Sequence, residues 1–246
     1  MVLKQFEPKK IYIRVEAQPI TTSWIYHNSD LWLISLSSDG SNWITIADKN
    51  LGATQVYNDG DVLSEANCGK YYQWGNNYWF PYTWATSIQW AQINASTYWP
   101  NNYYSNFVWV NYTWSWDSSD NQDLRWETTN TLVARRWPCD EGYHIMSESE
   151  MVAFISAYKA ITWDNNFANA WDNLMLPLSY RTIANVLDTT EWDYWCSTPY
   201  NSYWRCLTFT WAYSVWNNIR YKSYWHHIRP FKNDAVQPDD SRTKLY

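Results

Sequence analysis

The sequence predicts an α+β fold, with two helices beside a twisted mixed or antiparallel sheet and much irregular loop. The clearest helix begins at Ser147, because Ser147 and Glu150 have the spacing of a capping box. Met151, Ile155 and Tyr158 then recur at the interval of one helical face. Short β-branched and aromatic runs, bounded by turn residues, lie on both sides of this helix and are typical of strands.

The other elements follow in chain order. Strands are expected at residues 11–15, 32–34, 43–46, 194–196, 206–209 and 227–231. Ser64 is a good N-cap, so a first helix is expected within residues 64–74. Residues 75–126 are rich in Asn, Tyr, Trp, Ser and Thr, and we expect an ordered, aromatic-packed loop, because disordered segments are usually poor in aromatic residues.

The length of 246 residues allows one large domain, alone or with a small appendage. Residues 36–233 form the expected main domain, and residues 234–246 a polar tail. Residues 1–35 are either a small β segment that serves docking or oligomerisation, or edge strands of the main domain. No apolar run is long enough for a membrane span, and the first ten residues lack the apolar stretch of a secretory signal.

The charge balance argues against nucleic acid as a partner. The net charge is −6, and Arg135 and Arg136 are the only adjacent arginine pair. Binding to a duplex needs many Lys and Arg contacts to phosphate, and aromatic stacking on a single strand also needs a basic groove. We therefore expect neither nucleic-acid binding nor membrane insertion.

Five segments in order carry a family resemblance. They are WITIADKNLGAT (residues 43–54), GKYYQWG (69–75), PCDEGYHI (138–145), YWCST (194–198) and IRPF (228–231). Together they resemble C-type-lectin-like domains of the formylglycine-generating-enzyme branch. More narrowly, they are similar to the variable proteins of diversity-generating retroelements of phages and bacteria. The resemblance covers residues 40–233 and implies a C-type-lectin-like fold.

The resemblance also implies a function: recognition of a protein or glycan receptor on a cell surface, at a phage tail tip or a bacterial surface. Residues 193–227 correspond to the diversified region of such proteins, and a homotrimer is consistent with the family. Tyr, Trp, Asn and Ser are the residues that paratopes use for adaptable contact. The expected ligand contacts are Tyr200, Asn201, Tyr203, Arg205, Tyr213, Asn217, Asn218, Arg220, Tyr221 and Tyr224.

Two alternatives to this non-enzymatic role remain. An oxidase of the formylglycine-generating type would need a reactive cysteine pair, for which Cys196 and Cys206 are the candidates. A structural subunit would use its aromatic loops for assembly. Cys68 and Cys139 are either bonded to each other or a buried pair of free thiols.

No cofactor or metal is expected. The four cysteines and four histidines lack the spacing of a zinc site. Gln237-Pro238-Asp239 resembles a lectin sugar-specificity tripeptide, but it follows its partner motif instead of preceding it. Asp117, Asp120 and Asp123 offer oxygen ligands of the kind that Ca²⁺ prefers, yet a structural turn is the simpler interpretation.

The chain has 21 Trp and 6 Gly. Six Trp stand where the resembling family tends to carry Gly: Trp79, Trp84, Trp126, Trp137, Trp192 and Trp225. Trp and Gly codons differ by one base, and UGA is read differently in different genetic codes. Our hypothesis is that some of these Trp reflect such a reading, in which case they should be exposed and have positive φ. Trp43, Trp74 and Trp195 are instead expected to be core or loop-packing residues.

Overall fold

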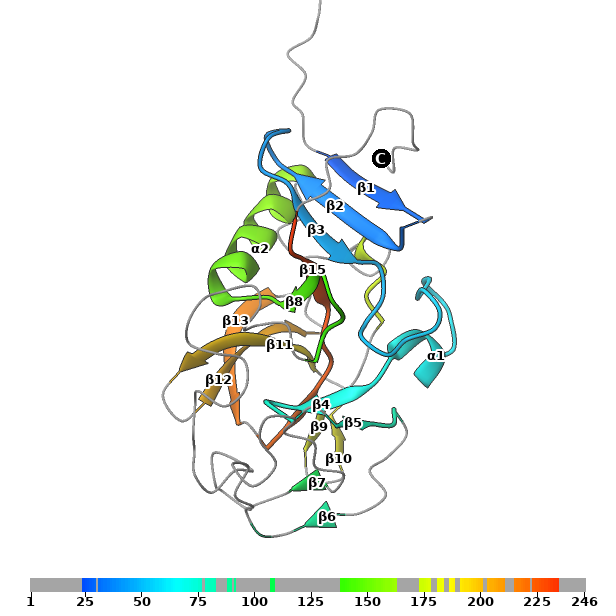
Figure 1. Cartoon of the computed structure of the whole chain (residues 1–246), viewed down its shortest axis with the longest axis vertical. Coiled ribbons are helices and arrows are strands. Elements are labelled where there is room, and N and C mark those ends of the chain that lie inside the picture. Colours follow the sequence, from blue (N-terminus) through cyan, green and yellow to red (C-terminus); the bar gives the residue numbers. More distant parts are fainter. Residues whose placement is uncertain are drawn as a thin grey trace, which may run out of the picture.

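A computed structural model describes residues 24–29, 31–76, 78–82, 88–89, 91, 107–108, 138–162, 173–177, 181–183, 186–188, 191–200, 203–210, 215–221 and 223–234. It has the predicted mixed α+β class, with two helices and several antiparallel sheets within these residues (Figure 1). The expected strand at residues 11–15 and most of the loop at 75–126 lie outside the described residues. None of the described helices is long and apolar enough to cross a membrane.

The first five-stranded sheet joins both ends of the described chain. Its order is β1 (Trp24–Asn28), β2 (Leu33–Ser37), β3 (Ile44–Ala47), β15 (Pro230–Lys232) and β8 (Tyr143–Ile145). All neighbouring strands are antiparallel. β1 is thus an edge strand, and β2 its neighbour, in the same sheet that holds β3 and β15, and the boundary expected between residues 35 and 36 falls within β2.

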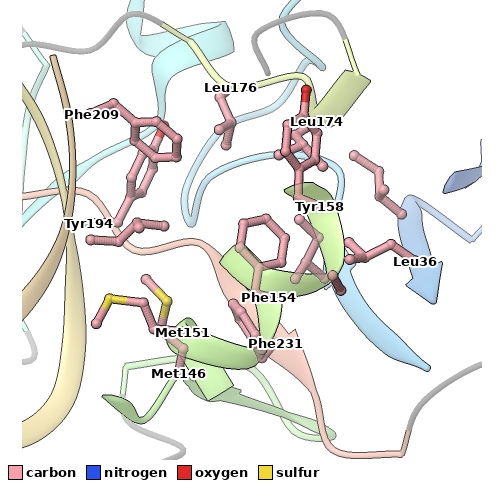
Figure 2. Packing of buried hydrophobic residues seen from close by; sticks show 14 of the residues in the cluster. Leu36, Met146, Met151, Phe154, Tyr158, Leu174, Leu176, Tyr194, Phe209 and Phe231 are labelled. Atoms are coloured by element: carbon pink, nitrogen blue, oxygen red, sulfur yellow. The ribbon is translucent and has the colours of Figure 1, made fainter. Parts of the chain in front are cut away.

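Helix α2 (Glu148–Thr162) confirms the predicted capping box. The Glu150 carboxylate accepts the Ser147 backbone N–H at 2.7 Å, and the Ser147 hydroxyl accepts the Glu150 N–H at 3.3 Å. Met151 and Tyr158 are fully buried, as their spacing predicts. They pack in one core with Phe154, Phe231 and residues of the later strands (Figure 2).

The second five-stranded sheet has the order β10 (Val186–Asp188), β9 (Arg181–Ile183), β14 (Trp225–His226), β4 (Tyr71–Gln73) and β5 (Trp79–Phe80). The helix expected within residues 64–74 is only α1 (Glu65–Cys68), so its predicted length was wrong. Gly69 ends it with φ of 79°, and a Cβ there would lie 2.6 Å from the Leu51 carbonyl oxygen. The chain then continues as β4.

A three-stranded antiparallel sheet completes the core: β11 (Glu191–Tyr200), β12 (Tyr203–Thr210) and β13 (Val215–Tyr221). β6 (Ile88–Gln89) and β7 (Phe107–Val108) form a separate parallel pair. In Figure 1, α2 lies between the first five-stranded sheet and this three-stranded sheet. Both contribute residues to the core around α2.

The expected core tryptophans are largely in place. Trp74 and Trp195 are fully buried in the core, and Trp43 is half-buried. Trp43 lies at the end of the β2–β3 loop, and its ring is 5.6 Å from that of Tyr26.

The expectation of exposed, strained tryptophans fails where it can be examined. Trp192 and Trp225 are 1% and 3% exposed, and neither has positive φ. Trp79 is 42% exposed but also lacks positive φ. Trp84, Trp126 and Trp137 lie outside the described residues. Among the described tryptophans, Trp32 combines positive φ (58°) with 49% exposure, and the sequence pattern did not single it out.

Candidate functional site

The register of the three-stranded sheet assigns its side chains to two faces. Residues directly opposite each other share a face, so Leu207 and Phe209 lie on the same side as Asn217. Leu207 and Phe209 pack with α2 in the main core. Trp204 and Cys206 point to the other side, where they pack against Trp74 and Ile228.

The helix covers only part of its face of the sheet. Toward the β11–β12 turn, the same face continues with Tyr203, Arg205, Ile219 and Tyr221, all of them half-buried. Glu148, in the first turn of α2, lies between the part of this face that the helix covers and the part that it leaves open. Its carboxylate pairs with Arg205 Nε at 3.3 Å and accepts a hydrogen bond from the Asn217 amide.

We call the aromatic residues at this open end the tyrosine patch, which consists of Tyr200, Tyr203, Tyr221 and Tyr224. Ring centroids are 5.1 Å apart between Tyr203 and Tyr221, and 5.2 Å apart between Tyr221 and Tyr224. Tyr200 pairs with Tyr203 across the hairpin and is 41% exposed. The Arg205 guanidinium lies 4.1 Å from the centre of the Tyr200 ring, a cation–π arrangement.

Tyr203 and Arg205 each interact with polar or charged neighbours in or beside the tyrosine patch. Desolvation and the neighbouring Tyr221 raise the pKa of Tyr203, so the Tyr203 phenol is neutral at physiological pH and can donate and accept hydrogen bonds. Arg205 is held between the Tyr200 ring and the Glu148 carboxylate. A guanidinium fixed on an aromatic ring loses less rotamer freedom on binding a ligand, because it is already ordered.

The predicted contact residues do not all meet. Tyr200, Tyr203, Arg205, Tyr221 and Tyr224 come together at the open end of the sheet, and Asn217 lies on the same face beside Glu148. Asn218 and Arg220 point to the opposite face of the sheet, away from the other predicted contacts. Asn201 and Tyr213 lie outside the described residues.

Arg220 forms an ion pair with Asp193. Its Nε is 2.8 Å from Asp193 Oδ2, and this carboxylate is 2% exposed. Asp193 also accepts the Thr208 hydroxyl and lies 3.7 Å from His226 Nδ1. Loss of Arg220 would leave the buried Asp193 carboxylate without this partner, which is costly.

Glu148 was missed by the sequence reasoning, although it organises the patch. It precedes Arg205 by 57 positions, and no local pattern indicates that the start of α2 meets β12. The acidic first turn of a capped helix was the available signal, since it marks Glu148 as a fixed carboxylate but does not name its partners.

The cysteines do not form a redox pair. Cys196 packs in the core beneath α2, whereas Cys206 packs on the opposite face of the sheet, and both are fully buried. Burial raises the pKa of Cys196 to about 12 and that of Cys206 well above its usual value. Cys68 and Cys139 are also buried free thiols, so of the two alternatives for this pair the structure has the unbonded one.

Metal binding finds no geometric support in the part of the chain that the structure describes. No group of three or more His, Cys, Asp or Glu side chains there is arranged to hold an ion. His226 and His227 point in different directions, the first toward Asp193 and the second toward the Lys70 carbonyl. Asp117, Asp120, Asp123 and residues 237–239 lie outside the described residues.

The fold and the site together define an α+β protein with several antiparallel sheets and a half-open aromatic face. Comparisons with protein-family models, with curated proteins and with solved structures found no match to this chain.

Proposed function

We propose that this chain is a C-type-lectin-like recognition module that binds a protein or glycan receptor on a cell surface. The observation that carries the proposal is the tyrosine patch with Arg205. Tyr and Arg are the residues that dominate binding hot spots, because they give large contact area and several hydrogen bonds for few frozen torsions. The five segments of the family resemblance give the scaffold.

In the three-stranded sheet, the core residues and the proposed contact residues are separate. Leu207 and Phe209 anchor the strands under α2, while Tyr203 and Tyr221 extend the same face beyond the helix. Because framework and contact residues occupy separate ends of this face, the outer residues can change without loss of the core. This is the property that a diversified protein at a phage tail tip or a bacterial surface needs, as a monomer or a homotrimer.

Binding to intact bacterial cells tests the function. The purified, fluorescently labelled protein is expected to bind cells of a susceptible strain saturably, measured by flow cytometry across a panel of strains. Tyr200→Ala removes the exposed ring and the Arg205 contact, so we expect at least about ten-fold weaker binding, which equals about 1.4 kcal/mol. Its melting temperature should stay close to that of the unaltered chain, because Tyr200 is exposed.

Tyr26→Ala is the matched control. Tyr26 is a half-buried tyrosine of β1, in the first five-stranded sheet, and it is not part of the tyrosine patch. Cell binding should be unchanged in this variant. Equal loss in both variants, or full binding by Tyr200→Ala, contradicts the assignment of the patch.

Sequencing many copies of the gene from one population tests the diversification. Substitutions should gather at Tyr200, Tyr203 and Tyr221, while Leu207 and Phe209 remain fixed. A uniform distribution of substitutions over residues 193–227 would argue against a diversified surface on a constant scaffold.

A further inference from the structure

Arg205 is ordered by its neighbours but keeps part of its hydrogen-bonding capacity for a ligand. Its Nε lies 3.3 Å from the Glu148 carboxylate, and its guanidinium lies 4.1 Å from the centre of the Tyr200 ring. The two terminal nitrogens, Nη1 and Nη2, form no hydrogen bond with any residue that the structure describes, and neither of them is buried. The end of the guanidinium that lies away from Nε is therefore accessible and has donors to offer.

This end of Arg205 has the geometry that suits a carboxylate. Nη1 and Nη2 direct their N–H groups within one plane, so they can donate two parallel hydrogen bonds to the two oxygens of one carboxylate. Such charge-assisted bonds are roughly twice as strong as neutral ones. Because Glu148 and Tyr200 already hold the guanidinium, little rotamer freedom is lost when the ligand binds.

The charge of Glu148 favours a ligand group with a single negative charge. Its carboxylate partly neutralises the guanidinium and repels any further anion nearby. A phosphate monoester carries nearly two negative charges at neutral pH, so this repulsion is larger for phosphate than for a carboxylate.

The tyrosine rings around Arg205 favour a protein as the source of the carboxylate. Arg205 covers one face of the Tyr200 ring. The rings of Tyr203, Tyr221 and Tyr224 pack against one another, with centroid distances of 5.1 and 5.2 Å. A sugar ring stacks on an open aromatic face, and these contacts reduce the open faces. Apolar side chains of a protein also pack against ring edges, as they do in tyrosine-rich interfaces.

We infer that the tyrosine patch binds its receptor through an exposed Asp or Glu side chain of a protein. The receptor carboxylate accepts hydrogen bonds from Nη1 and Nη2 of Arg205, while an adjacent apolar side chain packs on Tyr203 and Tyr221. This inference rests on the function proposed above, and it makes Arg205 the residue that selects among receptors.

Ligand-observed NMR on the full chain tests this inference with two probes that differ in one group. The probes are N-acetyl-leucyl-glutamate amide and N-acetyl-leucyl-glutamine amide. We expect saturation transfer to the leucine methyl protons of the glutamate probe, with millimolar affinity. The glutamine probe should bind about ten-fold more weakly, because its amide lacks the charge. The difference should shrink as salt is added. This comparison needs no variant protein.

Arg205→Gln and Lys232→Gln are a matched pair, because each removes one positive charge that lies on a tyrosine ring. The Lys232 ammonium is 4.5 Å from the centre of the Tyr143 ring, outside the tyrosine patch. Arg205→Gln should abolish the preference for the glutamate probe, whereas Lys232→Gln should keep it. Arg205→Lys retains the charge without the planar fork, so it should keep only part of the preference. Equal binding of both probes by the unaltered chain overturns the inference, as does an equal loss in Arg205→Gln and Lys232→Gln.

Two further probes separate other sources of the anion. Binding of glucuronate as tight as that of the glutamate probe would contradict a protein source, and tighter binding of O-phosphoserine would reassign the site to phosphate. The cell-binding experiment tests the proposed function separately. Cell binding without a preference between the probes overturns this inference alone, whereas the preference without cell binding supports it and overturns only the cell-surface role.

Discussion

Trp32 occupies a backbone conformation that glycine adopts freely and tryptophan rarely does. The left-handed region costs an L-residue roughly 1–2 kcal/mol, because Cβ approaches the following carbonyl oxygen. Trp32 is half exposed, so its indole recovers only part of this cost through packing. We therefore expect Trp32→Gly to raise the free energy of unfolding by roughly 0.5–1 kcal/mol, measured by urea denaturation.

Trp79→Gly is the matched control for this substitution. Trp79 is similarly exposed, but it lies in β5 with no positive φ, and the Lys70 ammonium is 3.5 Å from its ring centre. Glycine weakens a strand by roughly 0.5–1 kcal/mol, so this variant should be less stable than the unaltered chain. If Trp32→Gly and Trp79→Gly change the free energy of unfolding in the same direction, the role of strain at Trp32 is refuted.

His227 makes the stability depend on pH. It is 1% exposed, its Nδ1 donates to the Lys70 carbonyl oxygen at 3.0 Å, and its buried Nε2 has no partner. Burial, with the charge of Arg229, lowers the pKa of His227 from 6.5 to about 3. Between a pH of about 3 and pH 6.5, His227 is therefore protonated in the unfolded chain but neutral in the folded chain.

The stability that His227 contributes is fully present above pH 6.5 and is lost as the pH falls toward 3. The limiting slope for one proton is about 1.4 kcal/mol per pH unit. The free energy of unfolding from urea titrations should thus be lower at pH 5 than at pH 7. His227→Asn keeps a donor for the Lys70 carbonyl but does not titrate, so the difference between the two pH values should shrink. An unchanged difference would assign the effect to other groups.

At the scale of elements, the start of α2 depends on Ser147. Its hydroxyl and the Glu150 carboxylate satisfy backbone and side-chain donors at the first turn, and Ser147 is buried. Ser147→Ala should lower the free energy of unfolding by about 1 kcal/mol, the usual cost of a lost N-cap. Ser156→Ala, at an exposed position within α2, should change it by less than about 0.5 kcal/mol. Thermal denaturation of the two variants separates capping from helix propensity.

Local signals explain why some elements were predictable. The capping box of α2 and the β-branched runs of β2 and β3 each involve residues that are close together in the sequence. The structure has these elements where expected. The end of α1 was missed because Gly69 is constrained by the Leu51 carbonyl oxygen, a contact that lies 18 positions away along the chain. Sequence periodicity carries no information about such a contact.

The candidate site was predictable in type but not in arrangement. The excess of Tyr and Asn in residues 200–224 indicated a contact surface, and five of the predicted residues do meet at the tyrosine patch. Which face Asn217 and Asn218 occupy depends on the register of β13 against β12, and a shift of one residue exchanges the faces. The pairing of Arg220 with Asp193 follows from that register, because it brings the guanidinium to the side of the sheet where Asp193 lies.

At the scale of the whole molecule, the last described strands hold the two five-stranded sheets together. β14 lies between β9 and β4, and β15 lies between β3 and β8, so each is an interior strand. The segment between them also bonds to other elements: the Trp195 N–H donates to the His227 carbonyl oxygen, and the Leu51 N–H to that of Ile228, each at 2.9 Å. Strands that enter interior positions this late in the sequence make folding depend on contacts of high sequence separation.

A chain that ends at Tyr224 should therefore fail to fold, although it contains α2 and the whole three-stranded sheet. Loss of residues 225–246 would divide both five-stranded sheets and remove Phe231. Phe231 is 4% exposed, and its truncation alone typically costs about 3–5 kcal/mol. Such costs approach the 5–15 kcal/mol that stabilises a typical domain.

We expect circular dichroism to show no cooperative thermal transition for residues 1–224. A synthetic peptide of residues 223–234 added in trans should restore the transition, while the same peptide with Phe231→Ala should restore less of it. A cooperative transition in the truncated chain without peptide would mean that the three-stranded sheet and α2 form an independent unit, and the late strands would then be an addition to the fold, not its centre.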